Sequence, residues 1–283
     1  MLDSLAKKVC LVTGASSGIG KATCMRLAEK GATVVMVCRN SETGGKALEE
    51  IKKKIPQATL DLLTADLSRQ SAVRQLSADF LSKYQQLHIL VNNAGLALRN
   101  RVLSDDQIEM TFAVNHLAYF LLTNLLLDRL KAGAPARIIN VSSEAHRNAE
   151  FDSGNLQGER SYGGFKAYSI TKLCNVLFTY ELARKLNGTG VTVNAMHPGF
   201  LSTGIFRSAS GFLRLLVRMT AGSPDSGANA ILYLATAPEL QDVSGKYFNG
   251  TRQQLSSPVS RDPAAAAQLW EISAKLVQLP NKN

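Results

Sequence analysis

The sequence predicts a single-domain α/β fold built on a doubly wound parallel sheet. Three observations support this prediction: short apolar runs alternate with longer amphipathic segments, the runs are apolar at successive positions, and a glycine-rich loop follows the first run. Successive apolar residues are typical of parallel strands that helices cover on both faces. Strands that alternate with helices indicate βαβ units.

Six segments are expected to form the strands of this sheet: residues 8–14, 33–38, 58–66, 87–95, 136–143 and 191–199. Segments 21–31 and 71–84 have the apolar spacing of helices, and the first ends at Gly31, a residue type that commonly terminates helices. No linker rich in Pro, Gly or Ser divides the chain, so residues 1–283 are interpreted as one domain. The alternation breaks near residues 200–225, which is typical of an insertion.

The charge balance leaves several kinds of partner open. With 32 basic and 22 acidic side chains, the 283-residue chain carries a net charge of +10, which suits nucleic acid, a membrane surface or a phosphorylated ligand. No helix-turn-helix, zinc-finger or RNA-binding pattern is present, so nucleic-acid binding is not expected. The histidines lack metal-ligand spacing, so no metal site is expected either.

The cysteines and the N-terminal sequence predict a cytoplasmic protein. The four cysteines, at positions 10, 24, 38 and 174, form no C-x-x-C pair, and three lie in apolar runs, as reduced core residues do. No signal-peptide pattern precedes the first strand. The longest apolar run, residues 117–130, is interrupted by Thr123 and Asn124, and is therefore expected to be a core helix rather than a membrane span.

The loop TGASSGIG, residues 13–20, follows the first predicted strand and opens the first helix. Gly14 permits the tight turn, Gly18 lets backbone approach a pyrophosphate, and Gly20 allows close packing of the helix. A phosphate at the helix N-terminus is stabilised by the free amide groups there. In this strand–loop–helix context the loop indicates a Rossmann-like dinucleotide site, with cofactor contacts expected from Gly14, Ser16, Ser17, Gly18, Ile19 and Gly20.

The same letters also fit G-x-S-x-G, the nucleophile turn of serine hydrolases. That motif requires an oxyanion loop from an earlier strand. Here the motif follows the first strand of the chain, so the hydrolase interpretation is not favoured.

The end of the second strand indicates which dinucleotide binds. Proteins that bind NAD commonly carry a carboxylate there for the ribose 2′-hydroxyl, whereas this chain has Arg39 and Asn40. A planar guanidinium suits a 2′-phosphate, and Lys21 adds positive charge beside the loop, so NADP(H) is predicted. Asp66 and Leu67 close the third strand, where a side chain can meet the adenine, although an ordinary strand end fits them equally well.

The pattern Tyr-x-x-x-Lys occurs twice within residues 161–172, as Tyr162 with Lys166 and as Tyr168 with Lys172. On a helix, residues four apart share a face, and an ammonium group near a phenol lowers the pKa of the phenol. Such a tyrosine can act as an acid or base at neutral pH. Only a copy that lies on a helix is expected to have this property.

Local sequence separates the two copies. The glycines at 163–164 oppose helix formation, so Tyr162 is expected in a loop before the helix. Tyr168 begins a segment that has apolar residues at helical spacing and ends at Gly188. The sequence therefore favours Tyr168 and Lys172 as the reactive pair.

These motifs resemble, in order and over nearly the whole chain, those of the short-chain dehydrogenase/reductase family. The matching segments are TGASSGIG, NNAG, the asparagine in FAVNHLAYF, INVSS, YSITK and HPG. The resemblance implies that Tyr168 is the general acid/base and that Lys172 binds the nicotinamide ribose and lowers the tyrosine pKa. It further implies that Ser143, rather than Ser142, polarises the substrate oxygen, and that Asn115 supports a proton-relay water. Further cofactor contacts are implied for Asn93, Ala94, Gly95, Pro198, Gly199 and Thr203.

The chain further resembles the retinol dehydrogenase branch of this family. Ser143 and Tyr168 are 25 positions apart, more than is common in the family, and the extra segment contains an NLQGE stretch similar to one in that branch. The resemblance implies an NADP(H)-dependent oxidoreductase that acts on an apolar aldehyde, ketone or alcohol. Two alternatives are a steroid or quinone carbonyl reductase of the same family and a non-catalytic NADP-binding regulatory protein on the same fold.

Residues 203–222 mix aromatic and aliphatic side chains with three arginines. In the family the corresponding segment covers the substrate, so a substrate lid is expected here. Docking on an anionic membrane and plain packing against the domain are the alternatives. Long helices such as the one after Tyr168 often pair subunits in this family, so the resemblance also allows a homo-oligomer.

Overall fold

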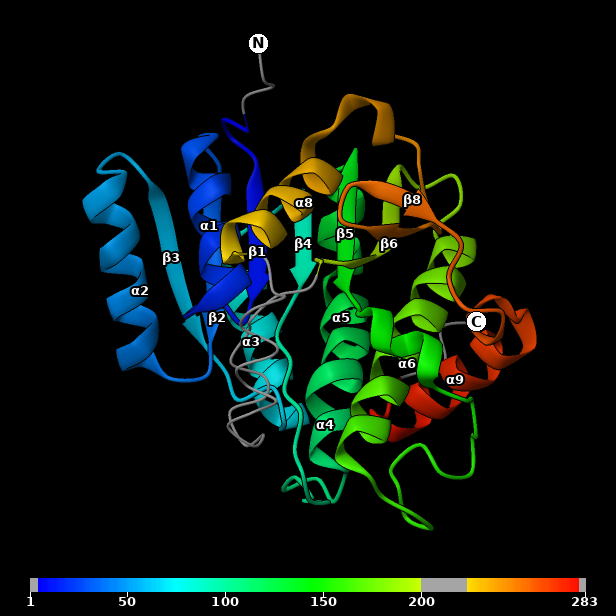
Figure 1. Ribbon diagram of the computed structural model, residues 1–283. Helices are drawn as coiled ribbons and strands as arrows, with labels where there is room; N and C mark the ends of the chain where they lie inside the picture. Colours follow the sequence, from blue (N-terminus) through cyan, green and yellow to red (C-terminus); the bar gives the residue numbers. More distant parts are fainter. Residues whose placement is uncertain (1–4, 200–222, 280–283) are drawn as a thin grey trace.

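The computed structural model describes residues 5–199 and 223–279, and these residues form the predicted Rossmann-like α/β fold (Figure 1). One mostly parallel sheet runs through the molecule. In spatial order its strands within the described residues are β3 (Thr59–Thr64), β2 (Thr33–Cys38), β1 (Val9–Thr13), β4 (Ile89–Asn92), β5 (Ala136–Val141), β6 (Val191–His197), β7 (Tyr247–Asn249) and β8 (Arg252–Gln254).

Helices cover both faces of this sheet. The α-helices of the described residues are α1 (Gly18–Glu29), α2 (Ser41–Lys54), α3 (Gln70–Lys83), α4 (Met110–Phe112), α5 (Ala118–Ala132), α6 (Gly164–Lys185), α8 (Pro224–Thr236) and α9 (Pro263–Leu276). Shorter turns are the π-helical η1 (Ala113–Leu117) and the 3₁₀-helical η2 (Glu144–Asn148), η4 (Pro238–Leu240) and η5 (Val259–Arg261).

The alternation of side chains along each strand divides the core into two layers. In β1, Cys10 and Val12 pack with α1, α2 and α8, whereas Leu11 packs on the opposite side with α3, α5 and α6. Helix α9 lies outside α6 on that second side and extends the same core. The apolar residues at successive strand positions therefore serve both layers, which is the reason the sequence shows unbroken apolar runs.

Two elements of the sheet escape the sequence pattern. β7 pairs with β6 in parallel and β8 returns antiparallel to β7, and each has three residues. A run of that length is too short to show a strand period. Helices α8 and α9, which flank this hairpin in the chain, start where Ser223 and Asp262 cap the first turn ahead of a proline.

The helix that carries Tyr168 begins earlier than expected. The glycines at 163–164 were expected to delay it, but α6 begins at Gly164. A Cβ atom on Gly164 would lie 2.2 Å from the Leu98 carbonyl oxygen, so glycine here allows the start of the helix to pack on the loop after β4. Tyr162 remains outside the helix, as predicted, and it does not share a helical face with Lys166.

The long apolar segment is a core helix. Among the described residues, Met110–Ala132 is the one stretch long and apolar enough to cross a membrane, and 78% of its apolar window is buried inside the protein. It comprises α4, η1 and α5 in continuous succession. The cysteines at 10, 24, 38 and 174 are free and buried, as the sequence indicated.

Burial also bears on subunit pairing. Every residue of α6 from 167 to 179 is buried, because η2, η1 and α9 surround the helix on the sides that the sheet leaves free. The expected pairing of subunits through this helix therefore has no exposed surface over that length. The expected lid, residues 203–222, lies outside the described residues, as does Thr203.

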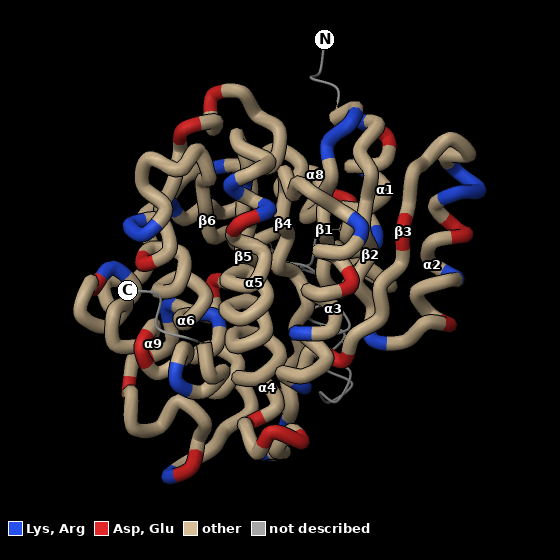
Figure 2. Tube along the Cα trace, turned by 180° about the vertical axis from the view of Figure 1, so that it is seen from behind, with Lys and Arg blue, Asp and Glu red and all other residues tan. Residues whose placement is uncertain are grey.

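Charged residues are distributed around the periphery of the molecule. Figure 2 shows basic and acidic positions interspersed over the outer helices and loops. The central strands β1, β4 and β6 contain no Lys, Arg, Asp or Glu. Among the described residues, the charged side chains thus lie mainly on the outer elements.

Candidate active site

The predicted site residues gather where the order of the sheet reverses. The chain passes from β1 outwards to β2 and β3, then returns to place β4 on the other side of β1. Ligands of open α/β sheets bind at the carboxyl ends of the strands beside such a reversal. The loops that follow β1, β4, β5 and β6 contain the motifs singled out in the sequence.

The glycine loop has the shape that its sequence predicts. Gly14 has φ of +69°, and a Cβ on Gly20 would lie 2.2 Å from the Gly14 carbonyl oxygen. Gly18 has φ of +56°, and the space that a Cβ would occupy there is open to 4 Å. Gly14 and Gly20 therefore make the turn tight, whereas Gly18 leaves room for a ligand against the backbone.

The segment after β4 is fixed directly to this loop. The Asn93 side-chain amide donates to the Thr13 carbonyl oxygen at 2.8 Å. In return, the Thr13 hydroxyl accepts from the backbone amides of Asn93 at 2.9 Å and Ala94 at 3.1 Å. These bonds join two motifs about eighty residues apart in the chain, and they place Gly95 next to the catalytic side chains described below.

The N-terminus of α1 fits a phosphate group. Ser17 is its N-cap, but the side chain makes no capping hydrogen bond, and the first turn contains no acidic residue. Ser16 is half-buried, Ser17 and Gly18 are exposed, and the Ile19 side chain packs into the core beneath them. Unpaired amide groups at an exposed helix N-terminus bind anions, so the residues present fit the pyrophosphate of a dinucleotide.

The end of β2 carries an exposed cation that suits a further phosphate. Arg39 is exposed. Lys21, expected to add charge beside the glycine loop, instead forms an ion pair with Glu50 of α2 at 2.7 Å, which neutralises it. Asn40 caps α2 by accepting from the Glu42 amide at 2.9 Å and the Thr43 amide at 3.1 Å, so its side-chain oxygen is occupied.

Asp66 remains ionised at the end of β3. Burial opposes its charge, but hydrogen bonds from Ser68 and the positive charges of Arg39 and Arg69 keep the pKa of this carboxyl below its usual range. Its Oδ1 accepts from the Ser68 hydroxyl at 2.7 Å. The Leu67 side chain packs against the core, so it presents mainly backbone to this region.

Asn115 lies in the π-helical turn η1, where a helix is often interrupted at a functional site. Its side-chain amide donates to the Leu96 carbonyl and its side-chain oxygen accepts from the Leu96 amide, both at 2.8 Å. The same amide also donates to the Thr171 hydroxyl at 3.1 Å. Asn115 thereby joins the loop after β4 to α6.

The two serines after β5 have different partners. The Ser142 hydroxyl donates to the Lys172 carbonyl oxygen at 2.8 Å and is buried in the structure of the helix. The Ser143 hydroxyl oxygen accepts from the Ala145 amide at 3.2 Å and hydrogen-bonds with Tyr168. Of the two, Ser143 is therefore the one that shares a substrate position with the tyrosine.

Tyr168 and Lys172 are both buried, and burial disfavours the charged form of each. It raises the pKa of Tyr168 to about 12, although the hydrogen bond with Ser143 acts in the opposite direction. It lowers the pKa of Lys172 to about 7. The Lys172 Nζ atom donates to the Val141 carbonyl oxygen at 2.9 Å and lies 5.6 Å from the Tyr168 ring centre. Burial therefore dominates the pKa of Tyr168, and the opposing influence comes from Ser143 rather than from Lys172 as the resemblance implied.

At the end of β6, Pro198 is buried and Gly199 has φ of +92°, and no atom of the described residues lies within 4 Å of where a Cβ would be. Backbone of this shape lets a planar ligand approach closely. The resemblance implies a cofactor contact at this turn, which stays a prediction.

Tyr119 is a site residue that the sequence analysis missed. Its hydroxyl donates to the Ala94 carbonyl oxygen at 2.7 Å, and its ring lies 5.9 Å from the Lys172 Nζ atom. It forms the buried wall between the segment after β4 and α6. Tyr119 lies in the apolar run 117–130, so only the presence of an aromatic residue among many apolar residues signals this role in the sequence.

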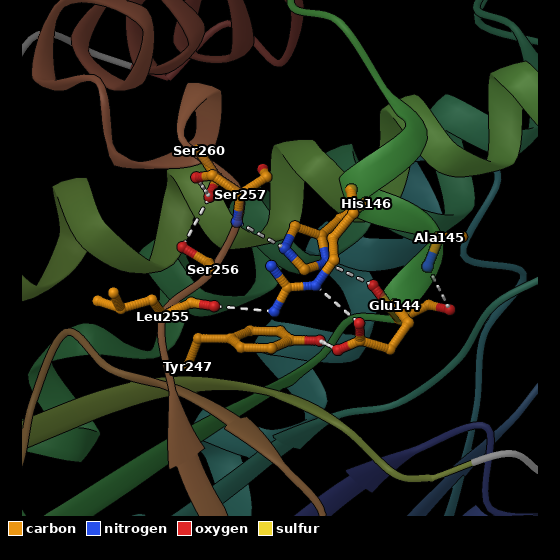
Figure 3. A network of polar contacts seen from close by, with 10 residues as sticks. Glu144, Ala145, His146, Tyr247, Leu255, Ser256, Ser257 and Ser260 are labelled. Atoms are coloured by element: carbon orange, nitrogen blue, oxygen red, sulfur yellow. Dashed lines mark hydrogen bonds and ion pairs between the residues drawn. The ribbon is translucent and has the colours of Figure 1, made fainter.

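A polar network behind Ser143 was also missed (Figure 3). Glu144 accepts from the Tyr247 hydroxyl and from Arg147, both at 2.7 Å, and Arg147 donates in turn to the Leu255 carbonyl oxygen at 2.8 Å. Burial alone would raise the pKa of Glu144. The hydrogen bonds from Tyr247 and Arg147 outweigh burial and keep this pKa below its usual value, so the carboxylate is ionised. The network holds η2 against β7 and the segment after β8.

His146 extends this network to the backbone of Ser143. Its Nε2 atom accepts from the Ser257 amide at 3.1 Å, and its Nδ1 atom lies 2.7 Å from the Ser143 carbonyl oxygen. Because a carbonyl oxygen can only accept, Nδ1 carries the proton and the ring is neutral. Burial lowers the pKa of His146, which favours that neutral form.

A phosphate-binding helix terminus and a buried tyrosine acid at one sheet edge are the two parts that hydride transfer to a carbonyl needs. They define the class of the protein as a nicotinamide-dependent oxidoreductase. The sequence profile of the family described as short chain dehydrogenase matches residues 8–212. The chain belongs to the short-chain dehydrogenase/reductase family, and within it to the retinol dehydrogenase branch.

Its relatives match over nearly the full chain. Retinol dehydrogenase 13 of Homo sapiens is 41% identical over 281 residues, which cover 96% of this chain and 85% of the relative. Retinol dehydrogenase 12 of Homo sapiens is 41% identical over 276 residues, covering 96% and 87%. These matches confirm the branch that the segment before Tyr168 indicated.

Solved structures share the fold. An uncharacterized protein from Mycobacterium Paratuberculosis superposes with a TM-score of 0.81 at 31% identity, covering 98% of this chain and 96% of that one. A short chain dehydrogenase from Burkholderia cenocepacia, solved in complex with NADP, has a TM-score of 0.71 at 26% identity, covering 87% and 97%. The predicted fold class is thereby confirmed.

Proposed function

We propose that this protein is an NADP(H)-dependent oxidoreductase of the retinol dehydrogenase type, which interconverts an apolar aldehyde or ketone and its alcohol. The observation that carries the proposal is the placement of the Tyr168 and Ser143 hydroxyls beside the buried Lys172, whose Nζ atom lies 5.6 Å from the Tyr168 ring centre. These two hydroxyls are the donors that a carbonyl oxygen requires while it gains negative charge.

The residues divide the chemistry between them. NADPH, when bound, supplies the hydride that adds to the carbonyl carbon. Ser143 holds the carbonyl oxygen, and Tyr168 donates its phenolic proton to that oxygen, which leaves a phenolate on the enzyme. Lys172 is close enough to stabilise this phenolate when it is protonated. Asn115, fixed by Leu96 and Thr171, supports the return of a proton to Tyr168, which completes the turnover.

The preference for NADP(H) rests on Arg39. It is the exposed cation at the end of β2, whereas Lys21 is already paired with Glu50. Arginine binds a phosphate through two parallel hydrogen bonds. The relative from Burkholderia cenocepacia that shares this fold binds NADP, which supports the same choice here.

The apolar character of the substrate is supported by the loop after β4. Leu96, Ala97 and Leu98 are half-buried in this loop, between Asn115 and the start of α6. An apolar wall next to a few polar groups is typical of a site for a mainly apolar ligand. The similarity to retinol dehydrogenases favours the same substrate class.

A paired assay tests the function. The purified protein is incubated with NADPH or NADH and with retinal, medium-chain aldehydes, steroids or quinones, and cofactor oxidation is followed. We expect turnover with NADPH and an apolar aldehyde or ketone, and loss of that turnover by at least about a thousandfold in Tyr168→Phe. Tight NADPH binding without turnover of any carbonyl would support a non-catalytic protein instead. Activity that survives Tyr168→Phe but is lost in Tyr162→Phe would overturn the assignment of the acid.

A further inference from the structure

Tyr162, the tyrosine of the other Tyr-x-x-x-Lys copy, has a defined partner in the structure. Its hydroxyl donates to the Oε1 atom of Glu109 at 3.2 Å and lies 3.3 Å from the Leu98 carbonyl oxygen. Lys166 is exposed, and Tyr162 stands outside α6. The hydroxyl therefore points at a carboxylate and a backbone carbonyl, not at a lysine, and a phenol that already donates in this way is poorly placed as a second acid.

Glu109 is a buried carboxylate with a structural task. It is 1% exposed and is the N-cap of α4. Its Oε1 atom accepts from the Thr111 amide at 3.0 Å and its Oε2 atom accepts from the Phe112 amide at 2.7 Å. Within residues 5–199 and 223–279 no ion pair to Glu109 is formed, so these two amides and Tyr162 supply its hydrogen bonds. Loss of one donor to a buried carboxylate costs more than loss of a neutral hydrogen bond.

The inserted segment before α6 attaches to Glu109 at a second point. The Glu109 backbone amide donates to the side-chain oxygen of Gln157 at 3.1 Å. Gln157 is itself held, because its carbonyl oxygen accepts from Arg101 at 2.9 Å. The inserted segment between Ser143 and Tyr168 therefore bonds to Glu109 at two points, through the Gln157 side chain and the Tyr162 hydroxyl.

That residue begins the helical stretch that leads to Asn115. α4 continues without a break into η1, in which Asn115 bonds to Leu96 and to Thr171. The Thr171 hydroxyl donates onward to the Tyr168 carbonyl oxygen at 2.8 Å. The same two chain segments are thus joined at both ends, by Tyr162 with Glu109 at one end and by Asn115 with Thr171 at the other.

We propose that Tyr162 is a positioning residue for the reaction: by holding Glu109 it fixes the α4–η1 segment, and with it the Asn115 side chain against the backbone of Tyr168. This role rests on the proposed function for its effect on turnover, but not for its effect on the α4–η1 segment. It gives the inserted segment a task in catalysis.

The kinetic test compares Tyr162→Phe with Tyr233→Phe. Tyr233 also donates its hydroxyl to a glutamate, Glu239, at 3.0 Å, but on the exposed surface of α8. We expect Tyr162→Phe to lower kcat by about tenfold while KM for the carbonyl and Kd for NADPH stay within about twofold, because the lost contact orients groups of the transition state. Tyr233→Phe is expected to leave all three unchanged. A Tyr162→Phe enzyme with unchanged kcat, or with a loss confined to KM, would overturn the proposal.

Hydrogen exchange supplies a readout that needs no turnover. In the protein without cofactor, we expect the amides of residues 109–117 to exchange about tenfold faster in Tyr162→Phe than in wild type, since their cap is weakened. Exchange elsewhere in the sheet, and all exchange in Tyr233→Phe, is expected to match wild type. If wild type reduces no carbonyl, the proposed function fails while this measurement still decides the link from Tyr162 to the Asn115 segment. Equal exchange in residues 109–117 of both variants would overturn that link.

Discussion

The cofactor side and the catalytic side of the candidate active site are built in different ways. On the cofactor side, β1, α1 and the segment after β4 are joined by backbone shape: glycines that leave no room for a side chain, and a threonine that binds two backbone amides. On the catalytic side, side chains that follow β5 fix this backbone by bonding to the Tyr247 side chain of β7 and to backbone groups of the segment after β8, more than a hundred residues later. The first half depends on the absence of side chains, the second on particular side chains.

This difference predicts how each half fails. A close backbone approach cannot yield when a methyl group is inserted, so damage on the cofactor side is large and independent of pH. A side-chain network loses its contacts one at a time, and its charged members respond to pH. The catalytic side therefore degrades gradually.

The largest effect is expected from Gly20→Ala. The added methyl would lie 2.2 Å from the Gly14 carbonyl oxygen and 2.7 Å from the Asn93 amide nitrogen, so the loop must move. We expect a loss of about 4 kcal/mol or more in the free energy of unfolding, together with loss of NADPH binding. Chemical denaturation and fluorescence titration measure the two quantities.

Gly45→Ala is the matched control. Gly45 lies inside α2, and nothing is within 4 Å of the position that its Cβ would take. Since alanine favours a helix over glycine, this variant should gain up to about 1 kcal/mol. If both alanine variants were equally stable, the cofactor side would not depend on backbone approach.

The second effect concerns pH and the catalytic side. Burial lowers the pKa of Lys172 to about 7, whereas an unfolded lysine keeps its proton to about 10.4. Between these values the unfolded state binds more protons, so the stability of the wild type should rise with pH by roughly 3 kcal/mol from pH 7 to 10 relative to Lys172→Met. Below pH 7 both states are protonated, and the folded state bears the full cost of a buried charge.

Denaturation of the cofactor-free protein at several pH values measures this difference. Lys131→Met, at an exposed position on α5, is the control and should follow the wild-type profile. A constant difference between wild type and Lys172→Met across this range would mean that the lysine stays charged in the folded protein.

The smallest effect is expected from Tyr247→Phe. Glu144 then loses one donor but keeps Arg147, so the network loosens without collapsing. We expect a loss of about 1–2 kcal/mol in stability. In a double-mutant cycle with Glu144→Gln, the coupling energy should be about 1 kcal/mol, and an additive result would show that the bond contributes nothing to the catalytic side.

The same contrast explains what the sequence could predict. The glycine loop, the Arg39 strand end and the Tyr168 helix were all identified because each is a local pattern whose geometry follows from its own residues. The fold class followed from the apolar runs for the same reason. The role of Gly20 can be predicted from the loop sequence itself, since a side chain at this position would clash with the Gly14 carbonyl oxygen.

What the sequence could not predict depends on which segments meet. The sequence around Glu144 does not indicate that Tyr247 is its partner. The strand β7 has three residues, too few to show a strand pattern that would predict its place in the sheet. Lys21 was misjudged for this reason: its charge is cancelled by Glu50, which lies on the next helix. The start of α6 was misjudged because Gly164 is needed for close packing on the loop after β4, and this contact is not visible in the local sequence.

The order in which the chain is made gives the polar network a further consequence. β1, the glycine loop and the start of the segment after β4 all lie in roughly the first third of the chain, and they can join once they have left the ribosome. The polar network behind Ser143 cannot form until Tyr247 and Ser257 have been synthesised. The buried His116 needs a still later residue, because its Nε2 atom lies 2.8 Å from the Ser273 hydroxyl. A nascent chain would thus hold a formed nucleotide loop well before it holds an ordered reaction centre, because residues 247–273 complete surroundings whose other side chains were made much earlier.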